Sequence, residues 1–238
     1  MEEISYQGVL SYDEILPMEV ASFGDGAVTK IQFDERVQGP YWTVRESGAL
    51  VGFMNAAVRT EYLHIMHIEV APVFRRRGIA GRLLDAARAF AAEAGVPRMM
   101  LRVRADNTPA RSLYQKHNFR ETGRRQCRFA LPVERLPAGT DIRAERGGDG
   151  YRYPVRLVRR GYEVGAGQFN EEVSGVKDIR LENPETDLLP ALAALRSLLK
   201  PGSELLYVMT DDDAVIQSCE DSRLILQSTI LDLECPLT

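Results

Sequence analysis

An apolar strand that leads directly into an arginine- and glycine-rich bend, and from there into a helix, most constrains the fold of this chain. Residues 70–81 read VAPVFRRRGIAG. Glycines let backbone N–H groups turn toward a bound group, and the N-terminus of the following helix adds partial positive charge, so phosphate oxygens are favoured there. The segment therefore predicts an anion site between a strand and a helix.

The elements on both sides of the bend follow from the pattern of apolar residues. Tyr62 to Val70 is rich in β-branched and aromatic residues, which predicts a strand. A helix is predicted over residues 79–94, because apolar residues recur there at steps of three and four and Gly95 and Pro97 follow as stop signals. The apolar residues are Ile79, Leu83, Ala87, Phe90, Ala91 and Ala94.

Three phosphate-binding designs share this order of elements, and the spacing of residues separates them. A mononucleotide P-loop needs a Lys-Ser or Lys-Thr pair after its last glycine, where this chain has Ile79 and Ala80. A dinucleotide fingerprint needs three spaced glycines and an acidic residue at the end of the next strand. Only Gly78 and Gly81 are available, and the next predicted strand, Met99 to Arg104, ends in arginine. The first design is excluded and the second is disfavoured.

Two blocks of sequence support a third phosphate-binding design. Residues 75–80 read RRRGIA and match the Arg/Gln-x-x-Gly-x-Gly/Ala pattern of the GNAT superfamily's pyrophosphate loop. Residues 107–119 read NTPARSLYQKHNF and are similar to that superfamily's Asn-x-x-Ala-x-x-x-Tyr-x-x-x-Gly-Phe. Asn118 replaces the glycine at a helix C-cap, where asparagine is the next-best residue for a positive φ. The chain thus resembles the GNAT N-acetyltransferases.

The resemblance implies a GNAT-like acyl-CoA N-acyltransferase domain over residues 1–132, with a mixed α+β (α/β) fold and a central, mostly antiparallel sheet. A hairpin of that sheet is predicted to turn at Ser47 and Gly48. Glycine, proline and charged residues concentrate in residues 133–150, which we expect to be a linker. Residues 151–238 then form a second domain.

The second domain is predicted to be a degenerate, GNAT-like copy of the first. Asp211 to Ala214 can be laid without gaps over Asn107 to Ala110, which places Ser218 on Tyr114. Glu185 to Asp187 stand where the first domain has its arginine-rich loop, and their charge would repel a pyrophosphate. An unrelated αβ cap is the alternative, and on either interpretation we expect this half to bind no acyl-CoA.

The amino-acid composition limits the expected cellular location and the expected binding partners of the protein. Three scattered cysteines are too few for a disulfide framework or a zinc site, so we expect no metal and a reducing, cytoplasmic location. No apolar run approaches membrane-spanning length, and the N-terminal residues lack the pattern of a signal peptide. Residues 75–130 carry fourteen Lys or Arg against four Asp or Glu, whereas residues 163–238 carry five against fifteen. Because the basic residues cluster near the phosphate loop, a polyanionic cofactor explains them more simply than nucleic acid.

The resemblance implies acetyl-CoA as the co-substrate. Backbone groups of Ile68 and Val70 would pair with its pantetheine arm, and Asn107 would contact the cofactor near that arm. The pyrophosphate would lie on the amides of the loop and the helix start, with two arginine side chains beside it. The amides belong to Arg77, Gly78, Ile79, Ala80 and Gly81, and the side chains to Arg75 and Arg82.

Acetyl transfer to an amine needs a neutral amine, a stabilised oxyanion and a proton for the departing thiolate. By resemblance, Tyr114 is the general acid. His64 is the first candidate for the general base, because strand alternation places it on the face of Val70, near where several GNAT members carry a basic carboxylate, and because it titrates near neutral pH. His67 and Glu69 point to the opposite face and are second choices, and ordered water is a further one.

We therefore expect an N-acetyltransferase that moves an acetyl group from acetyl-CoA to a small-molecule or peptide amine by direct attack. A non-catalytic acyl-CoA sensor or partner-docking module is the alternative, and the intact Tyr114 argues against it. Neither nucleic acid nor a membrane is expected as a partner, and a homodimer is allowed. The sequence does not identify the amine acceptor.

Overall fold

The computed structural model describes residues 2–8, 10–23, 29–30, 33–34 and 37–237. Contacts divide the chain into two compact units. Unit 1 contains residues 1–103, 107–122 and 232–238, and unit 2 contains residues 104–106 and 123–231. Within the described ranges, no helix is long and apolar enough to cross a lipid bilayer.

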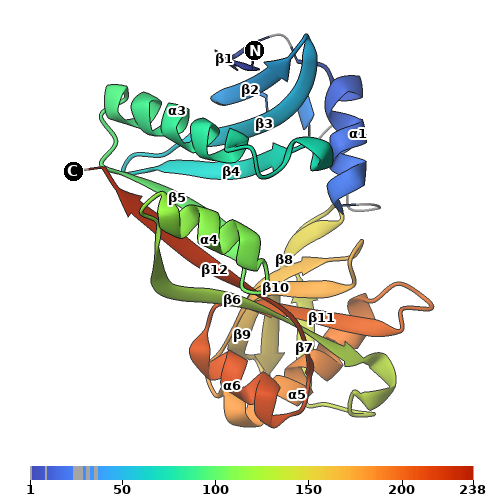
Figure 1. The fold of residues 1–238 in the computed structure, drawn as a ribbon. Helices are drawn as coiled ribbons and strands as arrows, with labels where there is room; N and C mark the ends of the chain where they lie inside the picture. Colours follow the sequence, from blue (N-terminus) through green and yellow to red (C-terminus); the bar gives the residue numbers. More distant parts are fainter. Residues whose placement is uncertain (1, 9, 24–28, 31–32, 35–36, 238) are drawn as a thin grey trace. The chain divides into compact units, whose positions relative to one another are not determined.

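Unit 1 is a mixed sheet with helices on its faces (Figure 1). In chain order its elements are β1 (Glu2–Tyr6), α1 (Tyr12–Phe23), β2 (Tyr41–Glu46), β3 (Ala49–Val58), β4 (Leu63–Val70), the 3-10 turn η2 (Pro72–Phe74), α3 (Ile79–Glu93), β5 (Arg98–Arg104) and α4 (Thr108–Lys116). Strands β1 to β4 pair antiparallel in sequence order, and β4 pairs parallel with β5. The C-terminal part of β12 (Ile225–Pro236) completes this unit beside β5. The predicted mixed, mostly antiparallel sheet is confirmed.

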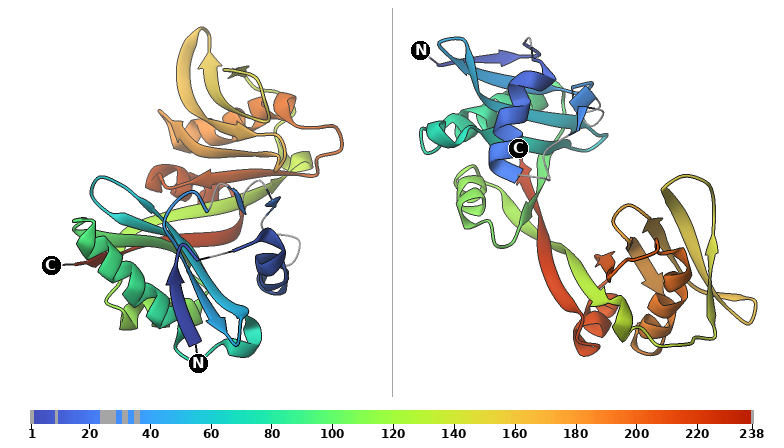
Figure 2. Two further views of the ribbon diagram at one scale, coloured as in Figure 1. Left: turned by 90° about the horizontal axis from the view of Figure 1, so that it is seen from above. Right: turned by 90° about the vertical axis from the view of Figure 1, so that its right-hand side faces the viewer.

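Neighbouring residues of β3 show how the two long helices of unit 1 are placed. Phe53 packs in one cluster with Ile15 of α1, whereas the Cα of Gly52 lies close to Ile79 of α3. Because adjacent residues of a strand point to opposite faces, α1 and α3 cover opposite faces of the sheet (Figure 2). Residues 51–56 are consequently all buried.

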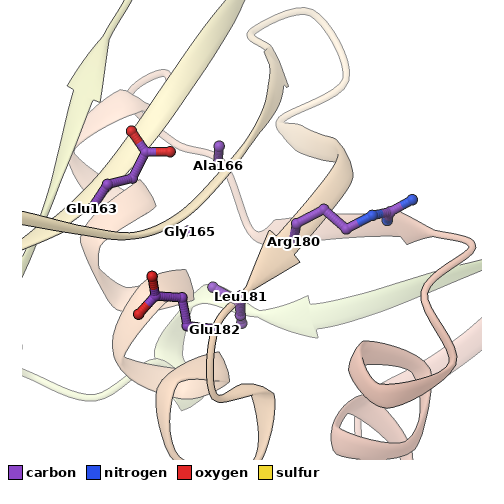
Figure 3. Close-up of a pocket in the computed structure, with 6 residues that line it drawn as sticks. All are labelled: Glu163, Gly165, Ala166, Arg180, Leu181 and Glu182. Carbon is purple, nitrogen blue, oxygen red and sulfur yellow. The ribbon is translucent and has the colours of Figure 1, made fainter.

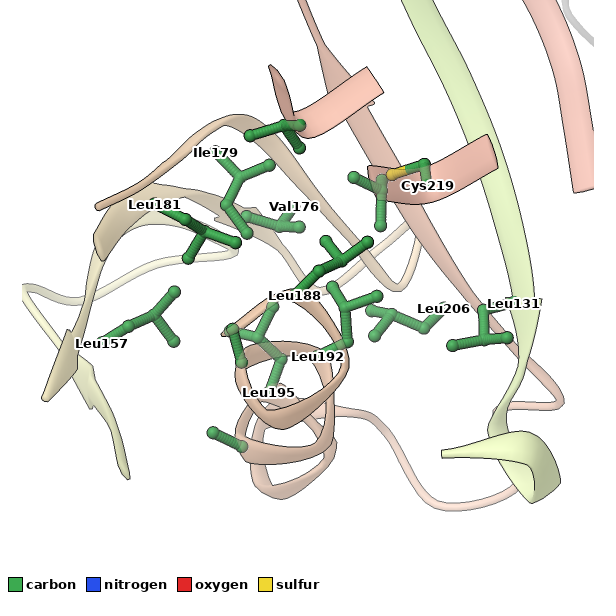
Figure 4. Close-up of a cluster of buried hydrophobic side chains, with 14 of the residues drawn as sticks. Leu131, Leu157, Val176, Ile179, Leu181, Leu188, Leu192, Leu195, Leu206 and Cys219 are labelled. Carbon is green, nitrogen blue, oxygen red and sulfur yellow. The ribbon is translucent and has the colours of Figure 1, made fainter. Parts of the chain in front are cut away.

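Unit 2 also contains both parallel and antiparallel strand pairs. Its elements are β6 (Arg120–Pro132, counted with unit 2 from residue 123), the 3-10 turn η3 (Val133–Arg135), β7 (Ile142–Arg146), β8 (Arg152–Arg159), β9 (Tyr162–Asn170), β10 (Gly175–Leu181), α5 (Pro184–Leu195), the 3-10 turn η4 (Arg196–Leu198), β11 (Leu205–Thr210), α6 (Asp213–Asp221) and the first part of β12. The strand order is β12-β6-β11-β10-β9-β8-β7. Leu188, Leu192 and Leu195 of α5 pack with Val176 and Ile179 of β10 in the core (Figure 4).

The two units repeat one order of elements. Unit 2 runs β7-β8-β9-β10-α5-β11-α6-β12, which corresponds to β1-β2-β3-β4-α3-β5-α4-β6. In both, a parallel pair joins the fourth and fifth strands of the repeat over three residues only. Residues 147–151 alone connect β7 to β8, at the place where unit 1 has α1. Unit 2 is therefore a reduced copy of unit 1.

The structure corrects the prediction that Glu185 to Asp187 replace the phosphate loop in unit 2. Only Glu182 and Asn183 separate β10 from α5, whereas residues 71–78 separate β4 from α3. Glu185 to Asp187 lie in the first turn of α5. The loop of unit 2 is thus shorter than that of unit 1. Its acidic residues belong to α5, which begins closer to the preceding strand than α3 does.

The overlay of the two halves also needs a shift of one residue. Asn107 caps α4 and Asp212 caps α6, so these two positions correspond. At the other helix ends, the N–H of Phe119 donates to the carbonyl of Tyr114, and the N–H of Leu224 donates to the carbonyl of Cys219. Cys219, rather than Ser218, therefore occupies the position of Tyr114.

Contacts place the boundary between the units differently from the sequence-based limits. The linker expected over residues 133–150 contains β7, which pairs antiparallel with β8. Ile142 is the only buried residue of β7, so this edge strand lacks the apolar alternation by which a strand is recognised. Strand β6 was assigned to the first domain as far as Pro132, but its residues from Cys127 onward pair with β11.

Replacement of Gly52 by alanine tests the packing of α3 on the sheet. An added Cβ would lie 2.8 Å from Ile79 Cγ2 and 3.4 Å from the carbonyl oxygen of Glu69. Because Ile79 has little rotamer freedom in a helix, we expect Gly52→Ala to lower the free energy of unfolding by about 1–3 kcal/mol in urea titrations. Gly139→Ala is the control, since its Cβ would meet no atom within 4 Å. Equal losses in both variants would contradict the packing described.

Candidate active site

Strands β4 and β5 separate after a short stretch of pairing. Their parallel register joins Leu63–Ile65 to Met99–Leu101 and, among the described residues, extends no further. Strand β4 nevertheless continues along β3 as far as Val70. Residues 66–70 therefore have one edge that β3 occupies and one edge that β5 leaves open.

Hydrogen bonding identifies the peptide groups on the open edge. The N–H of Ala71 donates to the carbonyl of Val51 at 3.0 Å, so Ala71 and alternate residues before it make the bonds to β3. Ile68 and Val70 consequently turn their N–H and C=O groups toward the open edge. The carbonyl of Val70 accepts a bond of 2.9 Å from Arg75 Nε. These are the two residues whose backbone was expected to face the cofactor.

The open edge lines a cavity of about 780 Å³ in unit 1. The other walls come from the loop after β4, the first turns of α3, and α4. Ten of the twelve predicted site residues line this cavity, and Arg77 and His64 do not. The ten are Ile68, Val70, Arg75, Gly78, Ile79, Ala80, Gly81, Arg82, Asn107 and Tyr114.

The loop has the backbone geometry of an anion site. Gly78 is the N-cap of α3 and has a φ of 81°. The N–H of Arg82 already donates to the carbonyl of Gly78, at 3.1 Å. The amides of the first helical turn before Arg82 have no intrahelical acceptor and lie where the dipole favours negative charge. These amides belong to the cavity wall.

The side chain of Arg77 pairs with Glu46 of β2 and does not line the cavity. Its guanidinium contacts both carboxylate oxygens of Glu46, at 2.7 and 3.2 Å, and lies 5.2 Å from the centre of the Phe74 ring. The hydrogen bond from Arg77 lowers the pKa of Glu46. Arg77 thus ties the loop to β2, and only its backbone remains a candidate for phosphate binding.

The second block supplies the opposite wall. Asn107 Oδ1 accepts from the N–H of Ala110 at 3.2 Å and so caps α4, and Asn118 ends that helix with a φ of 65°. Tyr114 is buried, and its ring meets Phe119 edge-on with 5.8 Å between centroids. Burial raises the pKa of Tyr114 to about 12, so the phenol stays protonated at neutral pH.

The structure does not bring His64 to the cavity. A β-bulge in β4 lies between Ile65 and His67, which pair with consecutive residues of β3. The extra residue reverses the alternation, so Ile65 instead of His64 shares the face of Ile68. His64 also lies where β4 is still paired with β5, and burial and the nearby Arg102 lower its pKa.

Other ionisable residues at the cavity were missed or ranked second by sequence reasoning. Glu69 lines the cavity, and His67 Nε2 lies 3.4 Å from Glu69 Oε2 and 3.0 Å from Glu19 Oε1. His117 also lines the cavity, with its Nδ1 at 3.2 Å from an Asp85 oxygen. His67 and Glu69 stand at alternate positions of a mostly apolar strand, and this pattern could have indicated a functional site from the sequence. The approach of Glu19 could not be predicted in this way, because it depends on how α1 packs against the sheet. Glu19, His67 and Glu69 are close enough to hold a cation, so the absence of a metal stays a prediction.

Comparison with known proteins supports the resemblance that the first half of the chain shows. Residues 11–119 match the model of the acetyltransferase (GNAT) family. These residues are similar in sequence to a GNAT domain. The chain is 29% identical over 122 residues to the mycothiol acetyltransferase of Jonesia denitrificans, a match that covers 47% of this chain and 38% of the relative. It is 32% identical over 82 residues to the uncharacterized N-acetyltransferase YhfO of Bacillus subtilis, which covers 32% of this chain and 55% of that protein.

The fold of the whole chain is shared with a solved structure. A tandem GNAT protein from the clavulanic acid biosynthesis pathway superposes with a TM-score of 0.71, covering 99% of both chains at 14% sequence identity. Identity at that level shows the fold alone. Unit 2 is thus GNAT-like in fold, while the curated relatives extend well beyond the parts that match this chain.

In unit 2 the side chain of Arg180 occupies the open edge of β10. The register of β10 on β9 ends at Leu181 opposite Gly165, as that of β4 on β3 ends at Val70 opposite Gly52, so Arg180 corresponds to Glu69. The Arg180 guanidinium donates to Thr210 Oγ1 at 3.4 Å and pairs with Asp211 and Asp212. Figure 3 shows it pointing away from the carboxylates of a small cavity. These contacts join β10 to the end of β11 across the gap.

Replacement of Gly78 tests the phosphate loop. We expect Gly78→Glu to abolish binding of acetyl-CoA in calorimetry, because a carboxylate would stand among amides that face an anion. An added Cβ would meet no atom within 4 Å, so the backbone cost arises from the positive φ alone. Gly48→Glu is the matched control, since Gly48 has a φ of 86° in an open turn outside the cavity. Near-native affinity in folded Gly78→Glu would contradict the loop assignment.

The stoichiometry of cofactor binding tests the difference between the units. We expect the same calorimetric titration of the wild-type chain to give one molecule of acetyl-CoA per chain, because only Glu182 and Asn183 connect β10 to α5 in unit 2 and Arg180 bridges its open edge. Two sites of comparable affinity would show that unit 2 also binds the cofactor. The Gly78→Glu variant then reports which unit binds, since only the unit 1 site should be lost.

Proposed function

We propose that this protein is an N-acetyltransferase that moves the acetyl group of acetyl-CoA to a primary amine. One observation carries the proposal: the open edge of β4, the N-terminus of α3 and the buried phenol of Tyr114 all line one cavity of about 780 Å³. A thioester on a phosphate-bearing arm needs this combination of backbone partners, anion site and proton donor. The family match of residues 11–119 supports acyl-CoA as the donor.

The residues of unit 1 divide into binding and chemical roles. The amides of Gly78 to Gly81 bind the pyrophosphate, and the arginine side chains Arg75 and Arg82 add countercharge at the cavity wall. Ile68 and Val70 offer peptide groups to the pantetheine arm. Tyr114 donates its proton to the thiolate that leaves when the amine attacks the thioester carbon.

Removal of the Tyr114 hydroxyl separates binding from turnover. In Tyr114→Phe the ring keeps its contact with Phe119, so the acetyl-CoA dissociation constant should change little while kcat falls by about 10²- to 10⁴-fold. Tyr162→Phe, an exposed tyrosine of unit 2, is the control. Wild-type rates in Tyr114→Phe would make solvent the acid, and a loss confined to KM would give Tyr114 a binding role.

The pH dependence gives a second test of Tyr114. A group that acts as an acid loses activity as the pH rises through its pKa. Since burial raises the pKa of Tyr114 to about 12, wild-type kcat should show no alkaline fall near pH 10.0, where an ordinary tyrosine titrates. A tyrosine-dependent fall at that pH, absent in Tyr114→Phe, would contradict the buried environment.

The function itself is tested by release of free CoA thiol from acetyl-CoA in the presence of a library of amines. The library should hold small amino metabolites, polyamines, aminoglycosides, lysine peptides and peptides with free N-termini. Thiol release that depends on one class of amine supports the proposal. Tight binding of acetyl-CoA with no release for any amine would favour the sensor or docking module.

A further inference from the structure

His117 ends α4 and turns its imidazole toward the first turn of α3. It is the C-cap residue of α4 and stands directly before Asn118. A Cβ added to Gly81 of α3 would lie 2.8 Å from His117 Nε2 and 3.1 Å from His117 Cε1. The imidazole therefore occupies the space that a side chain at position 81 would need, and the glycine leaves room for this ring.

This contact places Nε2 beside the amides at the start of α3. The Cα–Cβ bonds of a helix tilt toward its N-terminus, so the ring lies on the N-terminal side of Gly81. The amides before Arg82 have no acceptor within the helix. His117 and Gly81 both line the cavity of about 780 Å³. A phosphate group held by these amides would consequently lie next to the imidazole.

Nε2 of His117 is open to the cavity. The side chain keeps 20% of its surface exposed. Among the described residues Nε2 has no hydrogen-bond partner, and it is not one of the buried polar atoms that lack a partner. A polar atom that is neither paired nor buried faces solvent, and for this residue that solvent fills the cavity. The nitrogen can therefore meet a ligand without a rearrangement of its neighbours.

The other ring nitrogen is held in place. Nδ1 lies 3.2 Å from Asp85 Oδ1, one turn along α3 from Gly81. A carboxylate only accepts hydrogen bonds, so the proton of the neutral ring is on Nδ1 and the lone pair is on Nε2. Arg88 Nη2 donates to the carbonyl oxygen of His117 at 2.7 Å. The ring is thus oriented before a ligand arrives.

The state of Nε2 determines how the ring responds to an anion. A lone pair on Nε2 repels a phosphate oxygen, whereas the protonated ring donates from Nε2 to the phosphate and from Nδ1 to Asp85 at the same time. Histidine is the side chain whose charge changes between about pH 5 and 8. An anion bound at the start of α3 would therefore favour uptake of a proton by His117 from solvent.

The charged groups around the cavity favour the imidazolium once an anion is bound. Asp85 is the carboxylate that contacts the ring. β12 contributes the thiol of Cys235, which donates to the carbonyl oxygen of His117 at 3.5 Å. Cations from the phosphate loop, α3 and α4 oppose a further positive charge, and they are Arg75, Arg76, Arg82, Arg88 and Lys116. Two phosphate groups supply the negative charge that reverses this balance.

We propose that His117 binds the pyrophosphate of acetyl-CoA as an imidazolium, and that it takes up one proton from solvent when the cofactor binds. Asp85 is the residue that positions it. This inference rests on the proposed acetyltransferase function. It adds a group from the end of α4 to the amides of the phosphate loop, and neither of the two sequence blocks indicated that group.

The pH dependence of cofactor binding tests the inference by calorimetry. The ligands are acetyl-CoA and acetyl-dephospho-CoA. The second ligand keeps the pyrophosphate but lacks the 3′-phosphate, whose own ionisation near pH 6 would add a pH dependence. With either ligand, the wild-type dissociation constant should rise by about 5- to 30-fold from near pH 6 to near pH 8.5, because a charge-assisted hydrogen bond is lost.

Two variants at histidines show which residue is responsible. In His117→Gln the dissociation constant of the dephospho ligand should change by less than about twofold over the same range, because an amide takes up no proton. His64→Gln is the matched control and should bind like the wild type, since His64 does not line the cavity. Titrations near pH 7 in two buffers of different ionisation enthalpy should show uptake of up to about one proton in the wild type and none in His117→Gln.

Gly81→Ala moves the ring without removing it. The added methyl group would meet the end of the His117 side chain, which must turn away. The pH dependence should then shrink toward that of His117→Gln, while α3 is not weakened, because alanine is the better helix former. In the His117→Gln background the same change should alter the pH dependence no further. Because Gly81→Ala keeps the histidine, it tests the inference independently of how His117→Gln folds.

The outcomes separate this inference from the proposed function. If the wild type binds neither ligand at any pH, the proposed function fails. If the wild type binds both, but shows no pH dependence or shares its pH dependence with His117→Gln, the role of His117 is overturned and the function stands. If the effect appears with acetyl-CoA and disappears with the dephospho ligand, the assignment of His117 to the pyrophosphate is overturned.

Discussion

The short parallel pairing of β4 with β5 is the constraint on which the site of this protein depends. Three residues of pairing hold the two strands together, and beyond Ile65 no strand among the described residues lies beside the peptide groups of β4 on that side. Buried backbone groups must find partners, so an open edge inside a sheet is stable only where something else supplies them. In unit 1 the arrangement leaves Ile68 and Val70 facing a large cavity, directly before an anion-binding loop. The fold thereby offers backbone recognition to an extended ligand.

Unit 2 has the same arrangement of strands, but a side chain bridges its open edge. Its fourth and fifth strands also pair over three residues, yet Arg180 crosses from β10 to Thr210 and to the acidic start of α6. The glycine-rich loop is gone, and Cys219 stands in the position of Tyr114. Burial raises the pKa of this thiol to about 12. The copy retains the sheet and its core while losing the anion site and the phenol.

The parts of the site that the sequence predicted are those whose geometry is local. A glycine with positive φ before a helix, an asparagine N-cap and an asparagine C-cap each act within a few residues, and the structure has all three at Gly78, Asn107 and Asn118. The errors came from nonlocal or irregular features. The bulge before His67 reversed the alternation that had selected His64, and the approach of Glu19 to His67 depends on how α1 packs. β7 was missed because an edge strand with one buried residue has almost no apolar signal.

A crystal structure of the chain with acetyl-CoA tests the central claim most directly, that the open edge of β4 and the loop before α3 form the cofactor site. The account predicts hydrogen bonds between the pantetheine arm and the peptide groups of Ile68 and Val70, with the pyrophosphate on the amides of Gly78 to Gly81. A cofactor bound in unit 2, or bound in unit 1 with these peptide groups unused, would contradict it.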